Sequence, residues 1–313
     1  MFGVPAAGVR ASVEAEFRYY YKSFLFQGIS GMRAGPLLAL AFALALHGQD
    51  LKQAEALYQH TDYNGAIRVL RAIANPDART LALLGRSYFM DGDFKKATDS
   101  LQKAVALDPN NSEYMLWLGR TWGRRAETAS PFVAPMNAGH ARDCFQKAVA
   151  LDPANKEALS DLFDYYLEAP GFLGGGFDKA ANVARQIERI DPAEGHYAQA
   201  QLARKRQEYG EVESQLRRAM ELAPRQVGRV VDLAKFLARQ GRIQESEAAL
   251  AQADRLAPGS PRLLYERASI YVEAHQHLDQ ARELLKKYLQ SNLTADDPPR
   301  EDAQKLLRKV AGA

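Results

Sequence analysis

The chain of 313 residues contains a single cysteine, Cys144, and only 6 histidines. One cysteine excludes an intrachain disulfide framework and a cysteine-rich metal site. The Gly-x-Ser-x-Gly, His-Glu-x-x-His and Cys-x-x-Cys patterns of common enzyme classes are also missing. We therefore predict a protein that is not an enzyme and that needs no cofactor. Cys144 lies next to Phe145 within a predicted helix, so we expect its thiol to be packed against other side chains and not reactive.

Long apolar runs are scarce, and the charge is nearly balanced. Lysine and arginine number 41 against 38 acidic residues, a net charge of +3 that gives no reason to expect a nucleic-acid partner. The longest apolar run, over residues 35–46, is too short for a stable membrane span. It follows Met32 and Arg33, as in a secretory signal peptide, which we place at residues 32–48. The alternative is an uncleaved N-terminal helix.

If that leader is correct, translation begins at Met32 and residues 1–31 are an upstream extension of the reading frame. We then expect a protein secreted across an inner membrane, in the periplasm of a bacterium. If the leader prediction is wrong, we expect a cytoplasmic protein.

The clearest pattern in the chain spans residues 78–111. Two short amphipathic helices are expected there, joined at Asp91-Gly92-Asp93 and closed by Asp108-Pro109. The apolar and small residues of the two helices fall on one face of each, at Leu81, Leu84, Gly85, Tyr88, Ala97, Leu101, Ala104 and Val105. Similar units end at Pro153, Pro192, Pro224 and Pro258, so the closing prolines recur every 32 to 44 residues.

This unit resembles the tetratricopeptide repeat, a helix-turn-helix unit of about 34 residues. The resemblance rests on Leu84-Gly85, Tyr88, Ala97, Leu101, Ala104 and Pro109. It implies an all-α, right-handed α-solenoid of about seven repeats over residues 50–292. Residues 297–313 then form a capping helix with one apolar and one polar face.

Two of the expected repeats carry extra residues between their helices. About ten lie within residues 123–139, and about five lie within residues 169–177. The second insertion holds Gly174-Gly175-Gly176, but the Lys-Ser/Thr of a phosphate loop and a preceding strand are missing. We interpret it as a mobile loop with apolar tips. Both insertions emerge on the same edge of a solenoid, so they either contact a partner or cover an irregular junction. The contact residues predicted there are Phe132, Phe172, Leu173 and Phe177.

The resemblance also implies which side chains face the concave groove, because the first helices of successive repeats line it. Carrying over the groove positions of the family, repeat by repeat, predicts a cationic and aromatic surface with an acidic interruption near Asp164 and Glu168. The predicted binding residues are Arg86, Phe89, Leu116, Arg120, Arg124, Tyr197, Arg204, Lys205, Lys235 and Arg239. An ordinary solvated mixture of charges is the competing interpretation.

Metal binding has one weak candidate. His275, His277 and nearby Asp279 lie in an expected turn without a further ligand in sequence, so we predict solvated histidines and no metal site.

These observations favour a scaffold that binds another protein through an acidic or helical segment. No nucleic acid is expected as a partner, and the mature chain is expected to have no stable membrane span. An alternative is an accessory domain that binds envelope glycan or lipid, or presents it to an enzyme.

Overall fold

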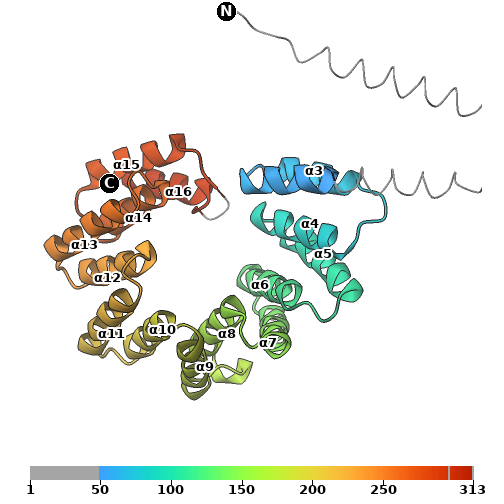
Figure 1. Cartoon of the computed structure of the whole chain (residues 1–313), viewed down its shortest axis with the longest axis horizontal. Helices are drawn as coiled ribbons and strands as arrows, with labels where there is room; N and C mark the ends of the chain where they lie inside the picture. The colour runs from blue at the N-terminus through green and yellow to red at the C-terminus, as the bar shows by residue number, and fades with distance from the viewer. Residues whose placement is uncertain (1–48, 295–296, 312–313) are drawn as a thin grey trace, which may run out of the picture. The chain divides into compact units, whose positions relative to one another are not determined.

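The computed structural model describes residues 49–294 and 297–311, and this part of the chain is helical in all its regular elements. The signal peptide predicted at residues 32–48 and the extension predicted at residues 1–31 lie outside the described residues. In the unit Asp50–Ala313, helices pack in consecutive antiparallel pairs (Figure 1).

Seven helix pairs follow one another in the described residues. The first helices of the pairs are residues 49–59, α4 (Ala78–Met90), α6 (Ser112–Thr128), α8 (Lys156–Glu168), α10 (Pro192–Lys205), α12 (Val227–Arg239) and α14 (Pro261–Glu273). The second helices are α3 (Tyr63–Ala72), α5 (Phe94–Leu107), α7 (Ala134–Leu151), α9 (Phe177–Ile190), α11 (Tyr209–Leu222), α13 (Ile243–Leu256) and α15 (Leu278–Gln290). The all-α solenoid predicted from the sequence is confirmed.

Asp and Asn side chains start most of the early helices. Asp77 accepts a hydrogen bond from the Thr80 N–H at the start of α4, and Asp93 accepts one from the Lys96 N–H at the start of α5. Such caps satisfy backbone donors that have no partner inside the helix. Between α4 and α5, Gly92 has φ of 84°, a left-handed conformation that glycine adopts without a steric cost. The turn predicted at Asp91-Gly92-Asp93 is therefore present.

Small residues let the two helices of a pair approach closely. A Cβ atom at Gly85 would lie 2.5 Å from Cγ of Leu101, and one at Gly119 would lie 2.6 Å from Cε1 of Phe145. Ala97 and Leu101 are completely buried at the same crossing. The apolar positions read at helical spacing in residues 78–111 thus form the contact between α4 and α5.

The insertion in the third pair lengthens its helices. α6 has 17 residues and α7 has 18, and only residues 129–133 connect them. The buried Asn137 donates from Nδ2 to the carbonyl of Arg125 at 3.2 Å, which ties the two extensions together. The sequence 123–128 is rich in strong helix formers, so the extra residues continue the helix and do not form a loop.

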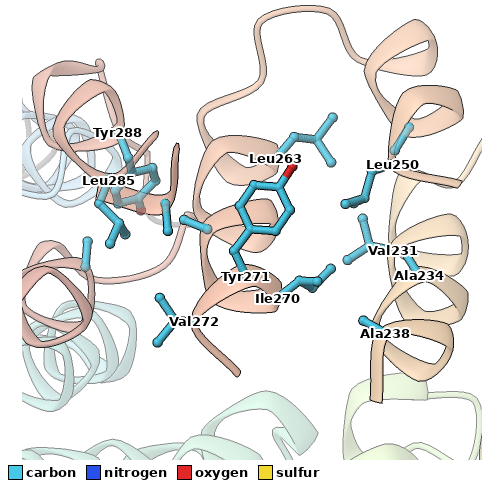
Figure 2. Packing of buried hydrophobic residues seen from close by; sticks show 14 of the residues in the cluster. Val231, Ala234, Ala238, Leu250, Leu263, Ile270, Tyr271, Val272, Leu285 and Tyr288 are labelled. Carbon is cyan, nitrogen blue, oxygen red and sulfur yellow. The ribbon is translucent and has the colours of Figure 1, made fainter. Parts of the chain in front are cut away.

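The last helix, α16 (Arg300–Ala311), packs against α15 and α14. Ala303 and Val310 are buried on one side of it, while Lys305, Arg308 and Lys309 are exposed on the other. Figure 2 shows the apolar cluster of this region, where Tyr288 and Leu285 of α15 and Ile270 and Tyr271 of α14 pack toward their neighbours. This arrangement matches the capping helix expected after the last pair.

Candidate interaction surface

The first helices lie on the inner side of the curve formed by the helix pairs, and the second helices lie on the outer side (Figure 1). We call the side formed by residues 49–59, α4, α6, α8, α10, α12 and α14 the inner face. Ten residues predicted to bind a partner come from these helices, so their surroundings decide what the inner face can do.

Ion pairs connect the first helices of neighbouring repeats along the whole inner face. Each joins a cation of one repeat to a carboxylate of the next or the previous repeat. The pairs are Glu55–Arg79 (2.6 Å), Arg86–Glu113 (2.9 Å), Arg120–Asp161 (2.5 Å), Glu168–Lys205 (2.8 Å), Glu194–Arg229, Lys235–Glu266 (2.6 Å) and Arg239–Glu273 (3.1 Å).

We call this series of ion pairs the ladder. It changes the charge that the sequence predicted for the inner face. Five of the predicted cations, Arg86, Arg120, Lys205, Lys235 and Arg239, each have a carboxylate partner in an adjacent repeat. The inner face therefore carries alternating charges, where the sequence predicted a mainly cationic surface. Long-range attraction of an acidic partner is reduced accordingly, because paired charges cancel at a distance.

The pairs differ in how much they stabilise the stack. The Arg120 and Asp161 side chains are 25% and 22% exposed, and Glu266 beside Lys235 is only 9% exposed. Removing one partner from such a pair leaves a desolvated charge, which costs several times more than breaking an exposed pair. Lys205 and Glu168 are largely exposed, so their pair contributes at most about 1 kcal/mol.

An aromatic–arginine cluster occupies the inner face between the first three repeats. The guanidinium of Arg86 lies 5.2 Å from the ring centre of Tyr58 and 4.7 Å from that of Trp117. The guanidinium of Arg120 lies 4.9 Å from the ring centre of Trp117, and the rings of Phe89 and Trp117 meet edge to face with their centres 5.5 Å apart. Each cation–π contact contributes about 0.5–1 kcal/mol at an exposed site. The structure thus brings together three of the predicted binding residues, Arg86, Phe89 and Arg120.

The remaining predicted residues of the inner face have different surroundings. Leu116 is completely buried in the core between repeats, so in this structure it is a packing residue and offers no contact surface. Tyr197 is half-buried beneath the guanidinium of Arg229, at 4.5 Å. Arg124 pairs with Glu127 of its own helix. The Arg204 side chain forms no ion pair or hydrogen bond within the described region.

One carboxylate near the middle of the inner face, Asp164, has a raised pKa. Although its surface is exposed, desolvation by the surrounding atoms of the inner face, together with the negative charges of Asp161, Glu168 and Glu194, raises the pKa of Asp164 to about 6. Unlike those three neighbours, Asp164 forms no ion pair within the described region. The acidic interruption expected at this repeat is therefore a site of like-charge repulsion.

The residues predicted at the insertions divide into two exposed and two packed side chains. Phe132 is 95% exposed and Phe172 is 82% exposed. Phe177 is half-buried, with the Arg206 guanidinium 4.1 Å from its ring centre. Leu173, in the short 3-10 helix η1 (Gly171–Leu173), is also half-buried.

Hydrogen bonds anchor the second insertion to the array. The carbonyl of Leu173 accepts from the Tyr165 hydroxyl at 2.8 Å and from Arg142 Nη1 at 3.2 Å. Gly176 N–H donates to the Tyr166 carbonyl at 2.8 Å. The loop expected to be mobile is thus held by several hydrogen bonds, while the Phe172 side chain projects into solvent.

Neither a metal cluster nor a membrane span occurs in the described part of the chain. No group of three or more His, Cys, Asp or Glu side chains is placed to hold a metal ion there. His277 instead lies with its ring centre 5.1 Å from that of Tyr271. Among the described helices, none combines the length and apolar character needed to cross a bilayer.

Sequence reasoning missed the carboxylates that complete the ladder. Glu113, Asp161, Glu266 and Glu273 were not among the predicted residues, yet each neutralises one that was. A signal exists in the sequence: Arg86 and Glu113 are 27 residues apart, and Arg120 and Asp161 are 41 apart, roughly one repeat. A search for opposite charges one repeat apart would have found these pairs.

Comparison with known proteins identifies the repeated unit. Residues 78–111 match the sequence family described as tetratricopeptide repeat. The fold is similar to a tetratricopeptide repeat protein from Parabacteroides merdae, with 16% identity, a TM-score of 0.54, and coverage of 85% of this chain and 98% of that one. A thermophilic tetratricopeptide repeat protein from Thermus thermophilus gives 20% identity, a TM-score of 0.51, and coverage of 61% and 98%.

No curated protein matches the sequence, and identities this low show likeness of fold alone. The matched unit contains Gly85, Ala97, Leu101 and Ala104, the residues at the crossing of α4 and α5. The same pairing continues from residues 49–59 to α15. Residues 78–111 are thus a tetratricopeptide repeat by sequence, and the fold of the described residues is similar to that of tetratricopeptide repeat proteins.

Proposed function

We propose that the protein is a non-enzymatic scaffold whose inner face binds an extended or helical segment of another protein. The tetratricopeptide repeat fold supports a role in protein–protein interaction, because stacked helix pairs present an extended surface. The specific partner segment, and the bacterial cell envelope as the place of binding, are parts of the proposal.

The observation that carries the proposal is the aromatic–arginine cluster of Tyr58, Arg86, Phe89, Trp117 and Arg120. Arg86 gives only Nη1 to Glu113, and its Nε is buried without a partner in the described region. It is one of five buried side-chain atoms without a partner in the described region, and it is the one that lies within this cluster. Clustered Arg and Trp side chains are also the residue types that dominate binding energy at protein interfaces.

The expected partner segment carries a carboxylate for Arg86 and an apolar side chain for Trp117 and Phe89. Arg86 has unused guanidinium N–H groups, which suit a carboxylate. Because Glu113 already occupies one of them, we expect short-range recognition with a moderate dependence on salt. This revises the sequence-based expectation of attraction by an unpaired cationic groove.

The first test is affinity capture from an envelope extract with the full chain as bait. The test bait carries Arg86→Gln, Arg124→Gln and Arg204→Gln together, three changes on the inner face. The matched control carries Lys103→Gln, Lys147→Gln and Arg255→Gln, which are exposed on second helices and have no recorded ion pair in the described region. Both variants lose three positive charges, and the inner-face variant also loses the ion pairs of Arg86 with Glu113 and of Arg124 with Glu127, so equal thermal midpoints of the two variants are checked first.

We expect one protein to be retained by the unchanged chain and by the control, and to be lost with the inner-face variant. Equal retention by both variants would refute the inner face as the binding surface and direct attention to Phe132 and Phe172. Retention of glycan or lipid without a protein would favour the alternative function, an accessory domain that binds or presents those molecules.

The envelope location rests on the signal peptide inferred for residues 32–48. Cell fractionation with a C-terminal tag tests it directly. A periplasmic product shortened by about the length of the leader supports the location, while an unshortened cytoplasmic product contradicts it.

A further inference from the structure

A cavity of about 550 Å³ lies where α12, α14 and α16 meet, at the end of the solenoid away from the aromatic–arginine cluster. One side of its lining is apolar and consists of Ala238, Ile243 and Ile270. Figure 2 shows Ile270 of α14 extending toward α12, on which Ala238 lies. The size is that of pockets that hold small ligands.

The other side of the cavity is cationic. Lys235 and Arg239 come from α12, and Lys309 comes from the last turn of the capping helix. Three cations from two helices that are far apart in sequence therefore converge on one cavity. Glu273 is the one carboxylate in the same lining.

One of the three cations in the lining, Lys309, forms no ion pair within the described region. Lys235 Nζ lies 2.6 Å from Oε2 of Glu266, and Arg239 lies 3.1 Å from Oε2 of Glu273, so both of these cations are neutralised. Lys309 has no ion pair recorded in the described part of the chain, whereas Lys305 on the same helix pairs with Asp302 at 2.9 Å. The Lys, Arg and Glu side chains of the site, with Glu266 included, therefore sum to +1.

One guanidinium nitrogen of Arg239 forms no hydrogen bond within the described region. Its Nε and Nη2 both contact Oε2 of Glu273 at 3.1 Å, while Nη1 has no hydrogen bond recorded among the described residues. A guanidinium N–H and an ammonium group that line the same cavity are thus both available to an anionic group.

We propose that this cavity binds a short aliphatic monocarboxylate. The carboxylate lies between Arg239 and Lys309, and the alkyl chain lies against Ala238, Ile243 and Ile270. The single net positive charge matches a monoanion, whereas Glu273 in the lining repels the second charge of a phosphate dianion. The apolar wall favours burial of the alkyl chain, and Ile243 is its most exposed member because Ala238 and Ile270 are 8% and 3% exposed.

Binding at this place has a structural consequence. Because the lining comes from α12, α14, the first residue of α13 and the capping helix, a ligand that contacts all of them stabilises their association. The stabilisation rises with ligand concentration as expected for any ligand that binds only the folded state. The cavity shares Lys235 and Arg239 with the inner face, but its ligand is a small molecule, so its test does not depend on a partner protein.

The test uses the full chain and two matched probes, 4-methylpentanoate and the uncharged 4-methylpentanamide. Binding is measured by isothermal titration calorimetry and by the thermal midpoint. We expect the carboxylate to bind and to raise the midpoint, and the amide to do neither. Lys309→Gln and Arg239→Gln should each weaken binding about tenfold, the loss expected for a charged hydrogen bond. Lys305→Gln, on the same helix, should leave it unchanged.

Three results would overturn the proposal. One is no detectable binding of 4-methylpentanoate at tens of millimolar, and another is equal binding of the amide. The third is inorganic phosphate binding as tightly as the carboxylate, which would indicate a general anion site. Lys309 is exposed and unpaired in the described region, so its replacement is not expected to disturb folding.

Discussion

Arg120 of α6 and Asp161 of α8 join the third and fourth repeats by an ion pair, with Nε 2.5 Å from Oδ2. Arg120 Nη2 lies 3.4 Å from Oδ1 of the same carboxylate, so the contact approaches a two-point pair. Burial raises the pKa of Asp161, and the positive charge of Arg120 opposes that rise. The pair therefore stabilises the junction mainly by preventing an isolated buried carboxylate.

Replacing Arg120 should weaken this junction. We expect Arg120→Gln to destabilise the protein by about 1–3 kcal/mol, because Asp161 keeps its desolvation cost and loses its charged donor. The measurement is amide hydrogen exchange in α6 and α8, which reports a local opening in a repeat array. Adding Asp161→Asn to the variant should restore part of the loss. As a control, Lys205→Gln breaks an exposed pair and should change exchange little.

Two glycines in first helices should respond oppositely to alanine. Gly85→Ala places a Cβ 2.5 Å from Leu101 Cγ and 3.2 Å from the Ala97 carbonyl, so we expect a loss of about 1–3 kcal/mol from overpacking. Gly123 in α6 has no atom within 4 Å of such a Cβ, and alanine there should stabilise by up to about 1 kcal/mol. Urea denaturation midpoints compare the two. Equal effects would contradict the close crossing of α4 and α5.

Asp164 should make the protein more stable at mildly acidic pH. Its pKa in the folded protein, about 6, lies above the ordinary value of 3.8, so the folded state binds a proton more tightly than the unfolded state. Stability from this group therefore increases as pH falls from 7 towards 5 and is lost as pH rises through 6.

The thermal midpoint measured between pH 7 and pH 5 checks this sign. The rise should be smaller in Asp164→Asn, which is uncharged throughout. A carboxyl NMR titration midpoint near 4 for Asp164 would disprove the predicted crowding. Below about pH 5, other carboxylates reverse the trend, since Asp93 and Glu213 have lowered pKa values through hydrogen bonds to Lys96 and Arg242.

Cys144 should be unreactive in the folded protein. Burial, with a smaller contribution from Asp143, raises the pKa of its thiol to about 12, so almost no thiolate exists at pH 8. We expect slow reaction with an aromatic disulfide reagent in buffer and rapid reaction in denaturant. Fast labelling of the native chain would show that the packing around α7 opens readily.

Much of the fold can be read from the sequence because its signals are local. The pattern Leu84-Gly85, Ala97 and Leu101 places small and large residues at helical spacing, and Asp93 and Asp108-Pro109 mark where a helix begins and ends. These preferences act within one or two turns of the chain. They predicted the repeated pairs and the final helix. The extra residues within 123–139 were wrongly expected to lie between the two helices of their pair, which they instead lengthen.

The candidate site depended on relationships that no local window contains. The predicted cations on the first helices are present on the inner face, but only the stacking of repeats decides that Arg86 meets Glu113 and Lys235 meets Glu266. The same stacking buries Leu116 and leaves Phe132 and Phe172 exposed. The sequence by itself determined the repeated helix pairs and the kinds of side chain on each helix. The tertiary structure decided which charges are neutralised, because the rotation and distance between neighbouring repeats set which side chains can touch.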